Sequence, residues 1–450
     1  MSDVTRAPVV GVAPSRPAAA RAIRLWPWLA ALLISAVLPW LFYDWQHARH
    51  AGFVVSVLSQ TGMMIIFALS FNMLMGQAGL LSFCHSVLFG LAGYSTVHFL
   101  NAAGAGELPV PMELMPLLAG LSGLGFAAVF GYVATKQRST AFAMITLGIV
   151  QLVTTAATMF HHFFGGEGGI STDRMIGHSF FGLEYAHSIE VYYLIVGWML
   201  IAAIGMYFHT NTPLGRMANA CRDNYERAQF VGYDPRMVRF VQFALAGFYA
   251  GIAGGLFAIT YEIVTFDAVA APLAANALLM AYIGGATTFF GPVLGAILIT
   301  LMQSGVSLMS NSWLVYVGVL FIAMVIFAPA GLTGLILRHA PIQRAGLLGR
   351  LVVPYARVLV PGLIVLVGFI GMVELLSFLT IGQAQGKRFE LFGHAIAIDS
   401  VVPWLVSLLC LVGGGAWLAR EARRFRVVWD GLMEIAQPGG ARTGAPGGTR

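Results

Sequence analysis

Few side chains in this sequence of 450 residues could carry out chemistry, because ionisable residues are almost absent from its long apolar runs. His85 and Glu374 are the two candidates within these runs. An ionisable group in such a run often marks a solute or proton path. A carrier driven by protons or ions usually keeps several such groups, and no catalytic pair shares one helical face here. The sequence therefore gives little support to a self-powered pump or an enzyme.

Motifs for nucleotide, metal or disulfide chemistry are also missing from the sequence. A P-loop holds phosphates with the spacing GxxxxGK[ST], and neither Lys136 nor Lys387, the only lysines, lies in that spacing. The three cysteines, Cys84, Cys221 and Cys410, form no CxxC pair, and we expect them to behave as small hydrophobic residues. We therefore expect no catalytic residue, no cofactor and no metal site in this chain.

Composition indicates what kind of protein has so little chemistry. Hydrophobic residues make up 58% of the chain and charged residues 10%, whereas a soluble domain has about 25% charged residues. The mean hydropathy is +0.81. So few charges cannot cover a surface in water, and lipid must take the place of water over most of it. The sequence therefore predicts an all-α fold, a polytopic bundle of transmembrane helices.

Apolar runs near the length of about 20 residues that a crossing helix requires recur along the chain. We expect twelve spans, ten in a main domain and two in a C-terminal extension. They lie near residues 25–43, 52–74, 80–100, 115–134, 141–161, 191–209, 241–260, 272–287, 292–308, 313–330, 357–381 and 399–418. The runs 80–100 and 272–287 are short or broken by glycines and polar residues, which leaves open whether they cross or re-enter.

The distribution of positive charge predicts the orientation. If the N-terminus is cytoplasmic, twelve crossings place the C-terminus in the cytoplasm as well. The external loops then hold only Arg49, Arg174, Lys387 and Arg388, which leaves 21 of the 25 basic residues inside. This agrees with the excess of Lys and Arg that cytoplasmic loops carry. The formal net charge of +6 thus reflects orientation, and we expect no nucleic acid as a partner.

The regions around the spans divide the chain into five parts. They are a cytoplasmic N-terminal tail (1–24), the main transmembrane domain (25–336) with a cytoplasmic loop at 211–239, an extension with two further spans (337–418), an amphipathic interfacial helix (419–436) and a disordered tail (437–450). The interfacial helix has an apolar stripe formed by Phe425, Val428, Trp429, Leu432 and Ile435. We expect this stripe to lie on the inner leaflet or against a soluble partner.

The loop at 211–239 is the longest charged internal loop ahead of the extension. Arginines alternate with acidic residues along it, and residues 214–230 have the composition and spacing of a short helix. Gly232 ends this helix, and Pro235 prevents its continuation. Charge alone does not distinguish a solvated loop from a short helix that lies in a groove of a soluble partner.

The loop resembles the coupling loop of branched-chain amino acid ABC transporter permeases. The residues that carry the resemblance are Gly215, Arg216, Ala220, Arg222, Asp223, Asn224, Ala228 and Gly232. Three further stretches are similar to the same family in the same order: 68–94, 136–152 followed by 163–170, and 282–296. The resemblance covers about residues 52–336, and it fits the LivM-type half of the LivH/LivM pair better than the LivH-type half.

The resemblance implies a subunit of a larger assembly in the bacterial inner (plasma) membrane. Its partners would be a LivH-type permease, two ATP-binding subunits that hold ATP and Mg, and a periplasmic solute-binding protein. The resemblance also implies that ATPase coupling falls to Gly215, Arg216, Arg222, Asp223, Asn224 and Gly232. The family expectation is an importer permease for a branched-chain amino acid or a similar small amphipathic solute. The alternative is a self-sufficient channel or secondary carrier for urea, an amide or an aromatic acid.

A helix break at Gly76–Gly79 is the preferred candidate for the translocation path, since breaks expose backbone donors and acceptors. The candidate residues are Asn72, Gly76, Gln77, Gly79, Ser82 and His85 around the break, with Thr146 and Gln151 on a neighbouring span. The alternative is that these polar groups only form hydrogen bonds between helices. Two sets of glycines at i, i+4 spacing predict close helix packing. They are Gly247, Gly251 and Gly255, and Gly291 and Gly295.

Overall fold

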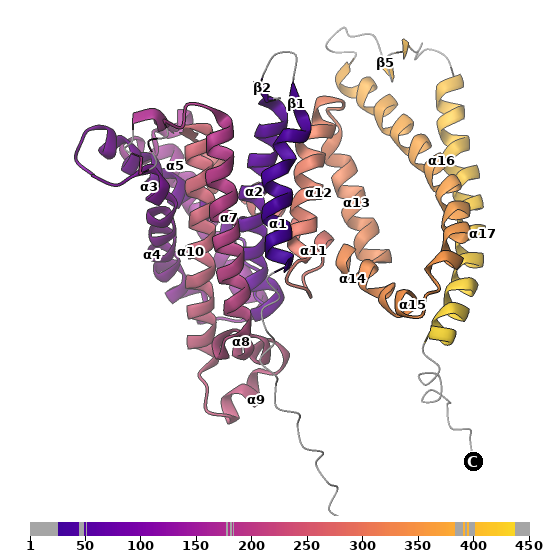
Figure 1. The fold of residues 1–450 in the computed structure, drawn as a ribbon, viewed down its shortest axis with the longest axis horizontal. Coiled ribbons are helices and arrows are strands. Elements are labelled where there is room, and N and C mark those ends of the chain that lie inside the picture. Colours follow the sequence, from indigo (N-terminus) through magenta and orange to yellow (C-terminus); the bar gives the residue numbers. More distant parts are fainter. Residues whose placement is uncertain are drawn as a thin grey trace, which may run out of the picture.

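The computed structural model is almost wholly helical, which confirms the predicted all-α bundle (Figure 1). It describes residues 26–44, 49–50, 52–176, 179–180, 182, 184–382, 390–391, 394–395 and 401–436. Both predicted terminal tails and Lys387 fall outside these ranges. Three pairs of two-residue antiparallel strands occur in the described connections: β1 (Tyr43–Asp44) with β2 (Arg49–His50), β3 (Ile170–Ser171) with β4 (Ile263–Val264), and β5 (Glu390–Leu391) with β6 (His394–Ala395).

The helices form a main bundle and a C-terminal hairpin (Figure 1). The main-bundle helices are α1 (Trp26–Val37), α2 (Gly52–Asn72), α3 (His85–Gly104), α4 (Met115–Ala134), α5 (Ser139–Met159), α6 (His161–Phe164), α7 (Ser188–Asn211), α8 (Pro213–Asp223), α9 (Tyr225–Phe230), α10 (Pro235–Tyr261), α11 (Ala271–Gly284), α12 (Gly291–Gly305) and α13 (Trp313–Phe327). The others are α14 (Gly331–Arg338), α15 (Ala340–Arg344), α16 (Val352–Ser377) and α17 (Val402–Ala436).

Eight of the described helical segments are long and apolar enough to cross a membrane. A ninth crossing results if α13 and the α14–α15 segment, which bend by 46° at their junction, form one span. The run 272–287 forms the 14-residue helix α11, which is shorter than the roughly 20 residues that a full crossing needs. The run 80–100 becomes helical only at His85, where α3 begins. The count of twelve spans therefore stays a prediction.

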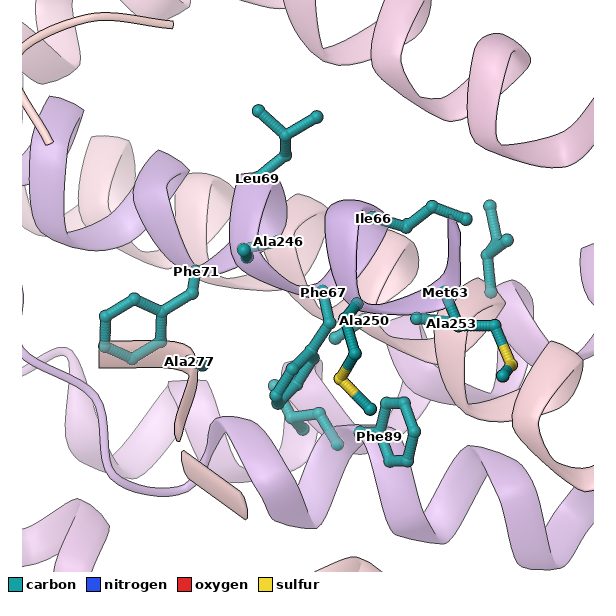
Figure 2. Packing of buried hydrophobic residues seen from close by; sticks show 14 of the residues in the cluster. Met63, Ile66, Phe67, Leu69, Phe71, Phe89, Ala246, Ala250, Ala253 and Ala277 are labelled. Carbon is teal, nitrogen blue, oxygen red and sulfur yellow. The ribbon is translucent and has the colours of Figure 1, made fainter. Parts of the chain in front are cut away.

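The core of the bundle surrounds α10, which packs against α4, α3 and α2. Small buried residues of α10, among them Ala246 and Ala250, leave room for aromatic rings from the neighbouring helices. Phe67 of α2 and Phe89 of α3 face each other beside Ala250, with 4.9 Å between ring centroids (Figure 2). Because lipid is as apolar as these side chains, the close packing itself holds the helices together.

The extension is a hairpin of α16 and α17 that stands to one side of the bundle (Figure 1). Gly368 permits the close contact within the hairpin, since a Cβ there would lie 2.8 Å from Cys410 Cβ. The Glu374 carboxylate joins the hairpin to the main bundle. It accepts hydrogen bonds from the hydroxyls of Ser310 and Tyr316, each at 2.5 Å.

Residues 419–436, predicted as an amphipathic interfacial helix, are the continuation of the preceding span. The backbone continues as one helix from Val402 to Ala436, because no glycine or proline interrupts residues 416–430 where the polar sequence begins. The polar part of α17 is therefore continuous with the apolar part of the same helix.

The apolar stripe of α17 contacts the chain itself. Leu432 is buried together with Ile342 and Leu351, and Phe425 and Trp429 pack against this cluster. Amphipathic spacing shows that one face of a helix is covered, but it does not identify the covering element. In this structure the short helix α15 covers part of that face. Val428 and Ile435 of the same stripe stay exposed.

Candidate functional site

The charged loop folds into two short helices, α8 and α9, at one end of the bundle below α7 and α10 (Figure 1). Each helix begins at a side-chain cap, which satisfies an amide without an intrahelical partner. The Thr212 hydroxyl accepts a hydrogen bond from Gly215 N, and the Asn224 amide oxygen accepts one from Arg227 N. Asp234 caps α10 in the same way, by accepting from Arg236 N. The caps fix the path of the loop between the two long helices.

Arg222 connects this loop to the helix break at the end of α2. Its guanidinium Nη1 donates a hydrogen bond to the carbonyl oxygen of Gly76. Its aliphatic part crosses Gly79, where a Cβ would lie 2.7 Å from Arg222 Cγ. Asp223 holds the guanidinium at 2.9 Å. The structure thus brings the predicted coupling residue Arg222, which is held by Asp223, against the predicted break.

The other predicted loop residues have different surroundings. Gly215 lies against the last turn of α7, where a Cβ would come 2.3 Å from the His209 carbonyl oxygen. Arg216 is exposed, and Gly232 ends α9 with a φ of +91°. Burial raises the pKa of the Cys221 thiol on α8, so this residue stays protonated and packs as an apolar group.

The break itself consists of a π-helical turn, Met73–Gln77, followed by the non-helical residues 79–84. Gln242 of α10 holds this turn through its amide nitrogen, which donates to the Met73 carbonyl at 3.1 Å and to the Gln77 side chain at 3.2 Å. The Gln242 amide oxygen lies 2.7 Å from His209 Nε2, which must be the donor. This network ties α10 and α7 to the break.

Sequence reasoning missed Gln242 and His209. Both lie in long apolar runs near the ends that join the charged loop, where a polar residue has no obvious partner in the sequence. A glutamine in the first turns of an otherwise apolar span was the available signal, because such a group needs a hydrogen-bond partner inside the protein.

The break also contacts the turn between α11 and α12. A Cβ on Gly76 would lie 2.4 Å from the Ala286 carbonyl oxygen. Gly285 of this turn has a φ of +113°, which only glycine adopts readily. The two helices that leave the turn touch at Gly291 and Gly295, where added Cβ atoms would meet the carbonyl oxygens of Gly285 and Met280 at 2.0 and 1.7 Å, respectively.

His85 and Asn72 are buried near the break. The Ser70 hydroxyl donates to the Phe67 carbonyl and lies 2.8 Å from His85 Nε2. With the Ser70 proton on the Phe67 carbonyl, the imidazole Nε2 carries the proton and Nδ1 is an acceptor. Within the described part of the chain, neither His85 Nδ1 nor Asn72 Oδ1 has a hydrogen-bond partner. Aromatic rings of Phe67 and Phe71 flank the imidazole, with centroids at 5.2 and 5.5 Å.

The remaining candidates for the path divide into two groups. The Thr146 hydroxyl accepts a hydrogen bond from Phe83 N at 3.1 Å, which joins α5 to the segment after the break. Ser82, in the same segment, is buried and donates to Cys84 Sγ at 3.9 Å. Gln151 is not part of this group, because it lies on the exposed face of α5.

Among the described residues, no cluster of three or more His, Cys, Asp or Glu could hold a metal ion.

The glycines of α10 lie against α4. A Cβ on Gly247 would lie 2.3 Å from Ala127 Cβ, and one on Gly255 would lie 2.3 Å from Ala119 Cβ. On Gly251, a Cβ would come 2.5 Å from the Ala119 carbonyl oxygen. The absence of side chains on one face of α10 thus lets the backbones of α10 and α4 approach closely.

Comparison with known proteins places this geometry in a family. No solved structure matches the chain. The high-affinity branched-chain amino acid transport system permease protein LivM of Escherichia coli (strain K12) is 26% identical over 325 residues, 68% of this chain and 74% of that protein. The ribose import permease protein RbsC of Haemophilus influenzae is 24% identical over 272 residues, 58% of this chain and 78% of that protein.

Part of the chain is also similar to a second type of permease. The probable branched-chain amino acid transport permease protein LivH of Methanocaldococcus jannaschii is 29% identical over 166 residues, 34% of this chain and 49% of that protein. Residues 53–329 match the family described as the permease component of the branched-chain amino acid transport system. This match spans more than half of the chain and includes the loop, the helix break and both sets of glycines. The chain is therefore a multi-pass membrane protein that belongs to the branched-chain amino acid transport system permease family.

Proposed function

We propose that the chain is the LivM-type transmembrane subunit of an ATP-binding cassette importer in the bacterial inner membrane. It pairs with a LivH-type permease and with two ATP-binding subunits, which hold ATP and Mg. A periplasmic binding protein delivers the solute, a branched-chain amino acid or a similar small amphipathic molecule. The observation that carries the proposal is the contact of Arg222, on the loop, with Gly76 and Gly79 at the helix break.

This contact supports a mechanical route from the loop to the pore. When the ATP-binding subunits close, they move α8 and α9, and Arg222 passes the displacement to the break. The Gln242 network and the close contact of Gly76 with Ala286 spread it to α10 and to the α11–α12 turn. Close packing favours discrete arrangements over gradual deformation, so a small push at the loop switches the bundle between two states.

Two buried acceptors give the proposed path its chemistry. Asn72 Oδ1 and His85 Nδ1 lie near the break without donors, and an unpaired buried polar atom is costly. A solute that carries N–H groups would supply those donors when the break opens. An α-amino group fits this requirement, and so does an amide. The acceptors therefore support a nitrogen-bearing solute and do not choose between an amino acid and a small amide.

The proposal is tested by gentle extraction of the tagged chain from native membranes, identification of its partners by mass spectrometry, and reconstitution in liposomes. We expect a second permease and ATP-binding subunits to copurify, and uptake to require ATP. In Arg222→Lys the point charge remains but the fork that reaches Gly76 is lost. ATP hydrolysis should continue in this variant while uptake falls, whereas Arg344→Lys, on an exposed residue of α15 outside the loop, should keep the two coupled.

A chain that purifies alone and moves solute without ATP would overturn the proposal. It would then act as a self-sufficient channel or carrier for urea, an amide or an aromatic acid. In that case Arg222→Lys would alter uptake with no ATPase present, which separates the two functions in one preparation.

A further inference from the structure

A second feature, separate from the loop and the break, is a pocket between α1, α2, α7 and α12. Its volume of about 460 Å³ lies within the range of about 300–1,000 Å³ that is usual for small-molecule sites. Its walls are aliphatic and aromatic, with Val57 and Ile65 from α2 and Ile297 and Leu301 from α12. No charged residue or histidine is present among the described residues that line it.

The polar groups of the lining are largely engaged within the protein. The Thr61 hydroxyl donates to the Val57 carbonyl, and the Tyr192 hydroxyl donates to the Ser35 carbonyl, both at 2.7 Å. The Ser35 hydroxyl is the one other side-chain polar group in the described lining. A zwitterionic solute or a peptide would bring charges or amides that find no partners here, at a cost of several kcal/mol for each unsatisfied group. The lining therefore suits a hydrocarbon.

The position of α1 explains why the space exists. Hydrogen bonds tie α1 and the turn after it to α7. Tyr192 reaches the Ser35 carbonyl, Tyr193 reaches the Ala36 carbonyl at 3.2 Å, and Trp40 donates to the Tyr193 hydroxyl at 3.0 Å. These contacts hold α1 on its α7 side, and the pocket separates it from α2 and α12. An apolar group in the pocket would contact α1, α2 and α12 together.

The pocket lies toward the end of the bundle that carries β1 and β2, away from α8 and α9 (Figure 1). Trp40 and the tyrosine pair lie beside it, and Trp and Tyr prefer the membrane–water interface. A lipid whose headgroup stays at this interface could place one tail between α1 and α2. A flexible chain of methylenes adapts to an irregular pocket and needs no hydrogen bond.

We propose that this pocket holds one acyl chain of a phospholipid, which completes the packing of α1 against α2 and α12. The assignment of this lipid to the periplasmic leaflet rests on the proposed function, because that function places α8 and α9 in the cytoplasm. The binding of a lipid tail does not depend on it. The inference can therefore be tested whether or not the importer proposal holds.

The test measures retained lipid by native mass spectrometry of the full assembly after exchange with a phospholipid that has deuterated acyl chains. In Val57→Trp the indole fills the pocket. Val129→Trp is the matched control, because Val129 of α4 is 67% exposed and outside the pocket. We expect the native chain and Val129→Trp to retain one more phospholipid per copy than Val57→Trp. Equal retention in all three would overturn the proposal.

A second variant and a second probe guard against misfolding and against another occupant. Ile297→Phe fills the pocket with a smaller change and should lose the same single lipid. In Leu301→Cys, a thiol-reactive lipid with its reactive group on the acyl chain should label the protein. Crosslinking of that thiol to a partner subunit, with no lipid adduct, would show that a protein side chain occupies the pocket and would overturn the lipid assignment. Copurified ATP-binding subunits in the same sample report separately on the importer proposal.

Discussion

The side chain of Arg222 crosses Gly79 so closely that a Cβ at position 79 would lie 2.7 Å from Arg222 Cγ. The two residues are far apart in the sequence, one on the charged loop and one at the break after α2. Gly79 has a φ of +67°, so both its backbone and its missing side chain are suited to this contact. A movement that Arg222 transmits from α8 to the break therefore acts through its contacts with Gly79 and Gly76.

Gly79→Ala should therefore uncouple the protein. The left-handed backbone costs an alanine about 1–2 kcal/mol, and the methyl group pushes against Arg222. Because 1.4 kcal/mol is a factor of ten in an equilibrium, we expect uptake to fall about tenfold while ATP hydrolysis by the assembled complex continues. Both rates are measured in the same liposomes.

Gly106→Ala provides the matched control for this substitution. Gly106 has a φ of +76°, and an added Cβ would meet nothing within 4 Å. It shares the backbone strain of Gly79→Ala but has no contact with the loop. Equal losses of uptake in the two variants would mean that strain alone, and not the contact with Arg222, explains the effect.

Gln242→Leu should destabilise the bundle. It would leave His209 and the Gln77 side chain without their partner in a buried region, and an unsatisfied buried group costs about 1–3 kcal/mol. The thermal midpoint of the purified chain should fall. Gln151→Leu is the control, since Gln151 is exposed on α5, and an unchanged midpoint for Gln242→Leu would contradict the network.

The sequence predicted features that depend on composition or on residues close together in the chain. Composition predicted the helical bundle, and Gly232 predicted the end of the helical segment 214–230, which the structure divides into α8 and α9 at Asn224. Contacts between distant residues could not be predicted in this way. The pairing of Arg222 with Gly76 depends on how two helices approach, and Gln151 faces outward because neighbouring helices fix the rotation of α5. The stripe of α17 was misjudged for the same reason, since its partner Ile342 is set by the tertiary fold.

Replacement of Asn72 and His85 together by alanine should reduce uptake more than assembly. The double variant removes both unpaired acceptors and empties a space beside Phe67 and Phe71. We expect normal copurification of the partner subunits and a raised half-saturating concentration of the solute. Normal transport by the double variant at normal expression would show that these residues do not border the path.

Gly251→Ala should weaken the contact between α10 and α4. The new Cβ would lie 2.5 Å from the Ala119 carbonyl oxygen, so the two backbones must separate, and such overpacking costs about 1–3 kcal/mol. Gly125→Ala adds the same methyl group to α4 where nothing lies within 4 Å. A lowered thermal midpoint is expected for Gly251→Ala alone, and identical midpoints would argue against close packing at this site.

Deletion after Ala340 should leave partial transport. The extension packs chiefly on itself: α16 contacts α17, and Leu432 is buried with Ile342 and Leu351, which are also removed. Its polar links to the retained residues include Glu374, which accepts from Ser310 and Tyr316, and the Tyr355 hydroxyl, which lies 2.6 Å from His339 Nε2. The hydroxyls of Ser310 and Tyr316 become exposed rather than buried on truncation, so the loss of stability should be modest.

Copurification of partners and uptake by the truncated chain measure the outcome. Tyr316→Phe in the full chain isolates the effect of the hydrogen bond between Tyr316 and Glu374. Complete loss of assembly on truncation, with normal assembly of Tyr316→Phe, would mean that the hairpin itself contacts a partner subunit.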